Sequence, residues 1–141
     1  MIRIREIDHL VLRSKHIQEM INFYVNVLGC RVERSLPAFG LTQLRAGNCL
    51  LDLVDVDGEL GRRGGAAPTA AGSNLEHFCL RIESFIGEEI KAYLLSHSVK
   101  PGDIESRYGA EGMGPSLYIC DPDGNTIELK GPPDLSIPPS R

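Results

Sequence analysis

Two histidines and two carboxylic acids, His9, Asp52, His77 and Glu128, stand at matching positions in two similar halves of the sequence. Imidazole nitrogen and carboxylate oxygen are ligands for zinc, nickel, iron(II), manganese and cobalt. A site with two histidines and one carboxylate leaves coordination positions open for water or a substrate, as a catalytic metal requires. There the metal would polarise a substrate oxygen or lower the pKa of a bound water. We therefore predict one divalent metal ion on His9, His77 and Glu128, with Asp52 as the candidate fourth ligand.

These residues are matched by an internal duplication of the chain. The segment IDHLVLRS at residues 7–14 resembles LEHFCLRI at residues 75–82 in its order of apolar, acidic, histidine and arginine positions. LLDLVD at residues 50–55 likewise aligns with TIELKG at residues 126–131. A single histidine in a strand is usually an ordinary packed or solvated residue. The recurrence of a histidine and a carboxylate in both copies favours a functional site.

Each half also contains the elements that would position such residues. Apolar residues at helical spacing predict helices at residues 16–28 and 85–96, each directly after its histidine segment. Short runs typical of strands follow each helix. They lie at residues 31–36, 41–46 and 49–56 in the first half and at residues 103–107, 116–120 and 126–130 in the second. The order of elements in both halves is therefore βαβββ.

The composition of the connecting segments separates these halves. We predict modules at residues 1–57 and 74–131, a Gly/Ala-rich linker at 58–73 and a proline-rich tail at 132–141. Alternation along each strand puts the histidine and the carboxylate on the face opposite the apolar residues that pack under the helix. We expect an α+β fold in which the two modules form a cupped, mostly antiparallel sheet with the helices on its outer face.

Composition and charge favour a protein that acts on small molecules. The chain has 141 residues, 42% of them hydrophobic, and a formal net charge of -4, without a dense lysine and arginine run. Neither nucleic acid nor an anionic membrane is therefore an expected partner. The first residues alternate between charged and apolar, unlike a signal peptide, so we expect a soluble cytoplasmic protein. The four cysteines form no CxxC pair and fit buried free thiols better than disulfides.

Four further residues are candidates for substrate binding: Arg13, Arg81, Tyr108 and Tyr118. Each arginine is the second-to-last residue of its histidine segment, where it would either hold an anionic part of the substrate or be a solvated cation at a strand end. Tyr108 lies in the glycine-rich stretch RYGAEGMGP, which is either a lid over the substrate or a hairpin without a catalytic part. Tyr118 lies in a strand whose side chains would set the size and polarity of a pocket.

Four segments together resemble the vicinal oxygen chelate superfamily, the group of glyoxalases, bleomycin-resistance proteins and extradiol dioxygenases. They are IDHLVLRS at the start, FYVNVLGCRV at residues 23–32, LEHFCLRI in the middle and SLYICDPDGNTIEL at residues 116–129. The resemblance covers nearly the whole chain and implies a paired βαβββ fold, a homodimer, and metal ligands at His9, Asp52, His77 and Glu128. Bacterial glyoxalase I normally has Glu where this chain has Asp52, which leaves open a site with three protein ligands.

The resemblance implies a metal-dependent glyoxalase-like lyase or isomerase acting on a small substrate with vicinal oxygens. In such an enzyme Glu128 or Asp52 would remove a carbon-bound proton while the metal stabilises the resulting enediolate. Two alternatives within the family are a fosfomycin-type epoxide-opening enzyme and an Fe(II) extradiol dioxygenase. A non-enzymatic drug-binding protein is the fourth possible function. It is disfavoured because such relatives lose the metal ligands.

Overall fold

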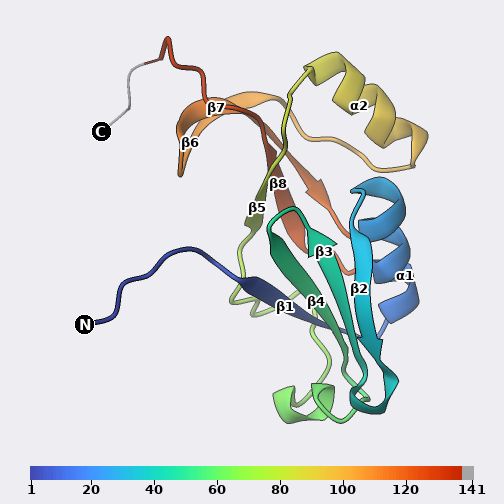
Figure 1. The fold of residues 1–141 in the computed structure, drawn as a ribbon. Helices are drawn as coiled ribbons and strands as arrows, with labels where there is room; N and C mark the ends of the chain where they lie inside the picture. The colour runs from blue at the N-terminus through green and yellow to red at the C-terminus, as the bar shows by residue number, and fades with distance from the viewer. Residues whose placement is uncertain (138–141) are drawn as a thin grey trace. The chain divides into compact units, whose positions relative to one another are not determined.

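The computed structural model describes residues 1–137 and divides into two compact units, Met1–Ser73 and a second unit that begins at Asn74. Each unit contains one four-stranded mixed sheet and one α-helix longer than a single turn (Figure 1). Of the proline-rich tail predicted at 132–141, residues 132–137 contain no helix or strand, and residues 138–141 lie outside the described residues.

The first unit has the order of elements predicted from its sequence. They are β1 His9–Ser14, α1 Ile17–Asn22, a π-helix Phe23–Val27, β2 Arg31–Leu36, a 3-10 helix Pro37–Phe39, β3 Leu41–Ala46, β4 Cys49–Asp55 and a 3-10 helix Gly61–Gly64. The strand order in the sheet is β1-β4-β3-β2, with β1 parallel to β4 and the other pairs antiparallel. The first and last strands of the module are therefore neighbours, which places the histidine strand beside the carboxylate strand.

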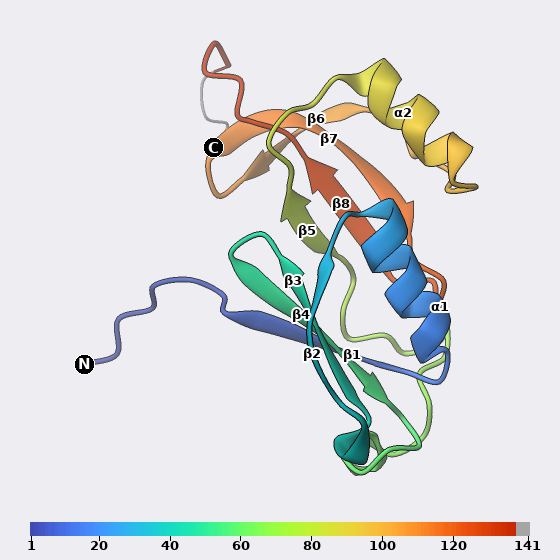
Figure 2. The same cartoon turned by 45° about the vertical axis from the view of Figure 1, so that its right-hand side comes forward.

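The second unit repeats this topology. Its elements are β5 Phe78–Arg81, α2 Gly87–Ser96, β6 Glu105–Gly109, β7 Gly112–Cys120 and β8 Thr126–Lys130 (Figure 2). The strand order is β5-β8-β7-β6, again with one parallel pair between the first and last strands. The α+β class and the two βαβββ modules are thus confirmed, and within each sheet most pairings are antiparallel.

The apolar residues of alternate strand positions form a separate core in each unit. In the first unit Leu44 and Leu53 of the sheet are completely buried, as are Met20 of α1 and Tyr24 of the π-helix. In the second unit the fully or almost fully buried residues are Leu94, Leu117, Ile119 and Ile127. Because side chains alternate between the faces of a strand, the opposite face of each sheet is left for polar residues.

The structure differs from the expected elements at the end of the first helix. The sequence predicts one continuous helix over residues 16–28, whereas the α-helix ends at Asn22 and a π-helical turn follows. In this turn the Leu28 amide donates to the carbonyl of Phe23, five residues earlier. The wide turn accompanies the burial of two adjacent rings, Phe23 and Tyr24, which pack edge to face with centroids 5.2 Å apart. Helical periodicity alone does not distinguish this arrangement from an α-helix.

The segment predicted as a linker, residues 58–73, belongs to the first unit and is bound to it by Arg13. The guanidinium of Arg13 donates to the carbonyls of Gly61 at 3.1 Å, Gly65 at 2.7 Å and Ala66 at 3.3 Å. Gly64 packs directly on this side chain, since a Cβ built on Gly64 would lie 2.2 Å from Arg13 Nε. In the structure Arg13 therefore fastens the loop to β1.

Replacing Arg13 by Gln is expected to loosen this loop. Arginine has a planar fork of several N–H donors, whereas glutamine is shorter and has a single NH2 group, which cannot bind three carbonyls. Limited digestion with trypsin measures the change, since Arg62 and Arg63 lie in the loop. We expect cleavage there to become about tenfold faster, as loss of charged hydrogen bonds shifts the local opening equilibrium. Arg5→Gln, a change at an exposed N-terminal arginine, is the control. An unchanged rate in R13Q would show that Arg13 does not hold the loop.

Candidate functional site

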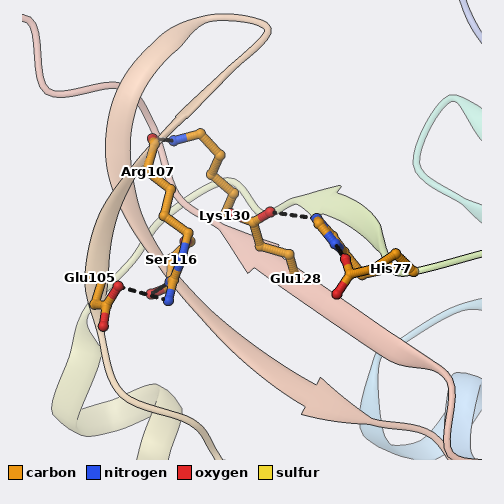
Figure 3. Close-up of polar contacts among 7 residues, drawn as sticks. His77, Glu105, Arg107, Ser116, Glu128 and Lys130 are labelled. Carbon is orange, nitrogen blue, oxygen red and sulfur yellow. Dashed lines mark hydrogen bonds and ion pairs between the residues drawn. The ribbon is translucent and has the colours of Figure 1, made fainter. Parts of the chain in front are cut away.

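In the second unit a histidine and a buried carboxylate lie side by side. Glu128 of β8 is paired in the sheet with Cys79 of β5 and Tyr118 of β7, and its side chain is buried. His77 directly precedes β5, and its Nε2 lies 3.4 Å from Glu128 Oε2 (Figure 3). The other oxygen, Oε1, is buried and has no hydrogen-bond partner. The pair thus presents an imidazole nitrogen and a carboxylate oxygen on the polar face of the sheet.

The first unit has a corresponding carboxylate on its own sheet. Asp52 of β4 is paired with Val11 of β1 and Gln43 of β3, and only 4% of the residue is exposed. Its Oδ2 accepts a hydrogen bond of 3.0 Å from Gln43 Nε2, whereas its Oδ1 is buried without a partner. His9 opens β1, two residues before Val11 on the same face. The two units therefore have the same unusual feature, a buried carboxylate with one unsatisfied oxygen.

Each histidine is oriented by the acidic residue that precedes it. Nδ1 of His9 lies 2.7 Å from Asp8 Oδ1, and Nδ1 of His77 contacts the Glu76 carboxylate. Metal-binding histidines commonly donate one ring N–H to a carboxylate, which leaves the other nitrogen for the metal. Neither Asp8 nor Glu76 was assigned a role from the sequence. The sequence did contain a signal for these two residues, because an acidic residue precedes the histidine in both copies of the duplicated segment.

The same contacts raise the pKa of both imidazoles. The hydrogen bond to Asp8 raises the pKa of His9 above its usual value, partial desolvation opposes this, and the charge of Asp52 adds to the increase. For His77 the hydrogen bond to Glu76 has the largest effect on the pKa, desolvation again opposes it, and the charges of Glu76 and Glu128 contribute further. Both histidines therefore lie in a negative environment that favours a bound cation.

The donor set fits a divalent metal ion. An ionised carboxylate is costly to bury unless its oxygens are paired with donors or with a metal, and Asp52 Oδ1 and Glu128 Oε1 have no such partner. Imidazole nitrogen and carboxylate oxygen match the metals expected from the sequence. Within residues 1–137 no three side chains of the metal-binding types are gathered in one place. Each unit by itself supplies one histidine and one carboxylate.

The remaining predicted site residues of the second unit are placed differently from one another. The Tyr118 ring packs edge-on against the His77 ring with centroids 5.3 Å apart. The Arg107 guanidinium lies over the Tyr118 ring, with its Cζ 4.4 Å from the ring centroid. Arg81 at the end of β5 forms an ion pair of 2.6 Å with Glu111. Tyr108 is exposed and lies at a strand position that faces away from the side of Glu128. Tyr118 is thus brought to the histidine, whereas Tyr108 is not.

The glycine-rich stretch forms the hairpin between β6 and β7, with Ala110 and Glu111 at its turn. Lys130, a residue that the sequence did not single out, is buried beneath it and donates to the Arg107 carbonyl at 2.7 Å. Gly109 makes room for this side chain, since a Cβ there would lie 2.6 Å from Lys130 Cε. The glycines therefore accommodate a lysine that connects the hairpin to β8. Closure of this segment over a substrate stays a prediction.

The cysteines are all free thiols, as expected, but only Cys30 is buried. Cys79 and Cys120 are exposed because strand alternation puts them on the polar face of the second sheet. Partial desolvation of the thiol, and next the charge of Glu128, raise the pKa of Cys79 to about 11.

In the described part of the chain, no helix has the length and apolar character needed to span a membrane.

The duplicated βαβββ unit, with its first strand parallel to its last, defines the class of paired βαβββ proteins. The chain belongs to the Glyoxalase/Bleomycin resistance protein/Dioxygenase superfamily, because the model of that family matches residues 6–129. The resemblance inferred from the four sequence segments is thereby confirmed.

The proteins that are similar to the chain include the following two relatives and two solved structures. The virulence protein STM3117 of Salmonella typhimurium is 32% identical over 132 residues, which are 89% of this chain and 83% of the relative. Biphenyl-2,3-diol 1,2-dioxygenase 3 of Rhodococcus globerulus is 30% identical over 128 residues, 86% of this chain. The chain spans only 60% of the length of that dioxygenase.

The crystal structure of STM3117 has a TM-score of 0.71 at 27% identity and covers 93% of this chain and 99% of its own. The lactoylglutathione lyase of Agrobacterium tumefaciens has a TM-score of 0.62 at 20% identity and covers 89% of this chain and 92% of its own. At that identity the likeness to the lyase establishes the fold alone.

Proposed function

We propose that this protein is a metal-dependent lyase or isomerase of the glyoxalase type, acting on a small substrate with vicinal oxygens. One divalent metal ion, nickel, zinc, manganese, cobalt or iron(II), would be held by His9, Asp52, His77 and Glu128. One observation carries the proposal: each unit has a buried carboxylate with one unpartnered oxygen, beside a strand that begins at or directly after a histidine. Membership of a generally metal-dependent superfamily supports it.

The residues of the second unit supply the proton chemistry. When bound, the metal would act as a Lewis acid that stabilises negative charge on the vicinal oxygens of the substrate. Glu128 would accept the proton from the carbon that carries one of these oxygens and return it to the neighbouring carbon. The rings of His77 and Tyr118 and the buried position of Glu128 restrict water on this side of the carboxylate. Tyr118 and Arg81 would contact the substrate, and the proposed substrate-binding role of Arg13 is limited by its bonds to the loop.

The proposal is tested with protein stripped of metal by a chelator and then reloaded with one metal at a time. Formation of a thioester from methylglyoxal and glutathione is followed by absorbance. Turnover that disappears with the chelator and returns with nickel or zinc is the expected result. The absence of turnover with every divalent metal would contradict a glyoxalase activity.

An Fe(II) extradiol dioxygenase is the second candidate function, because a relative from Rhodococcus globerulus that is 30% identical is named biphenyl-2,3-diol 1,2-dioxygenase 3. The same metal-free protein, loaded with Fe(II) under anaerobic conditions and then given a catechol and oxygen, decides between the two. Oxygen uptake with formation of a yellow ring-cleavage product would replace the glyoxalase proposal by this one.

We also propose a cytoplasmic homodimer, and the composition of its site can be tested by mixing variants. His9→Ala and Glu128→Gln each remove a ligand, one from each unit. If the two units that form a site come from different chains, mixed dimers of these variants contain one intact site and regain part of the activity. If both units come from one chain, no activity returns. Sedimentation analysis of the protein measures the dimer itself.

A further inference from the structure

A row of three polar side chains leads across the first sheet to Asp52. Arg34 of β2 is paired in register with Gln43 of β3, and Gln43 is paired with Asp52 of β4. The side chains follow the same order: Arg34 Nε donates to Gln43 Oε1, and Gln43 Nε2 donates to Asp52 Oδ2 at 3.0 Å. An exposed arginine is thus connected through a half-buried amide to a buried carboxylate.

The arginine determines which end of the amide faces Asp52. The oxygen and nitrogen of a glutamine side chain have nearly the same shape, so only their hydrogen bonds decide the orientation. A guanidinium has donors and no acceptor, and it therefore requires the amide oxygen on its own side. The NH2 group of Gln43 must then point to Asp52, where an ionised carboxylate accepts it. Arg34 consequently makes Gln43 a fixed donor to one chosen oxygen.

This arrangement leaves the other oxygen of Asp52 without a hydrogen-bond partner. Oδ2 is held by Gln43, while Oδ1 is buried without a partner. A row that served only to join the strands would gain nothing from a half-satisfied buried carboxylate, which is costly. In the second unit Tyr118 takes the place of Gln43 beside Glu128, and the orienting contact of Glu128 is instead with His77. The amide row is therefore particular to the shorter carboxylate, Asp52.

We propose that Arg34 and Gln43 are positioning residues, which hold Asp52 so that its Oδ1 is presented to the metal ion. This inference rests on the proposed metal site and makes Asp52 a true fourth ligand. Hydrogen-bonded partners of metal ligands contribute about 10–100-fold to metal affinity in other proteins. The row has this effect only through Asp52, because neither Arg34 nor Gln43 would touch the metal.

Cobalt(II) titration of the metal-free protein tests the inference without relying on activity. The visible absorption of bound cobalt reports the number and geometry of its ligands, and the titration gives the affinity. We expect Gln43→Leu, which keeps the approximate volume and removes the donor, to weaken cobalt binding about 10–100-fold and to change the spectrum. Arg34→Met, a change at an exposed residue, is expected to weaken binding less, and Arg34→Lys to restore most of the loss because lysine also only donates.

Two controls separate positioning from a general effect on the sheet. Arg45→Met breaks another cross-strand pair of the same two strands, Arg45 with Glu33 at 3.1 Å, without touching Asp52. It is expected to leave the cobalt affinity and spectrum unchanged. In the background of Asp52→Asn, Gln43→Leu is expected to have no additional effect, because the row acts through that carboxylate.

The outcomes are distinct. Wild-type affinity and spectrum in both Gln43→Leu and Arg34→Met, while the wild-type protein binds cobalt, would overturn the inference and leave the proposed function intact. An equal loss in Arg45→Met would also overturn it, since the effect would then come from the sheet. Failure of the wild-type protein to bind cobalt or any other divalent metal would overturn the proposed function and this inference together.

Discussion

Replacing Glu128 by Gln is expected to lower the affinity for a divalent metal more than about 100-fold. This exceeds the loss expected when a residue that is only hydrogen-bonded to a metal ligand is replaced. The substitution keeps the size of the side chain and removes its charge, so that both the ligand and the proton acceptor are lost. Metal-dependent turnover should disappear with it, because a carboxamide does not accept a proton near neutral pH. Cobalt titration measures the affinity, and thioester formation measures the turnover.

Glu111→Gln is the matched control for this prediction. It makes the same chemical change in the same unit, at an exposed residue of the hairpin that pairs with Arg81. The metal affinity of this variant should stay within about twofold of the wild-type value, because exposed ion pairs contribute little.

The stability of the metal-free protein provides a second test. Glu128 is buried with an unpartnered oxygen, so Glu128→Gln should leave the melting temperature equal or higher. A large decrease in melting temperature would instead indicate that Glu128 is a structural residue.

The second large effect is expected in the core of the second unit. Leu117 of β7 is completely buried, and Leu117→Ala should lower the free energy of unfolding by about 2–5 kcal/mol, through lost burial and the cavity left behind. Urea denaturation measures this value. Leu95→Ala is the control, because Leu95 is 61% exposed on α2, and it should change the free energy by less than about 0.5 kcal/mol. Equal effects of the two substitutions would contradict this placement of the core.

The same experiment examines whether the two units unfold together. Leu44 is fully buried in the first unit, and Leu44→Ala should cost a comparable free energy there. If the units unfold independently, each alanine variant shifts only one of two transitions. If they unfold as one, both variants shift a single transition.

Much of the fold could be predicted because it depends on local patterns. Period-two alternation and helical spacing are visible within a few residues, and β2, β3 and β8 have the predicted bounds. The two histidines and the two carboxylates could be matched because a duplication repeats whole segments. The hairpin of β6 and β7 was longer than predicted, because its pairing passes through glycines that have no strand preference of their own.

The sequence by itself therefore determined the duplicated βαβββ order and the candidate ligands His9, Asp52, His77 and Glu128. Only the tertiary structure decided the distant partners, namely Gln43 for Asp52 and the loop carbonyls for Arg13. The reason is physical: these partners meet through strand register and loop packing, over separations from 9 to more than 50 residues. No spacing rule within one segment specifies such contacts, since a shift of one residue in the register would turn every side chain to the other face.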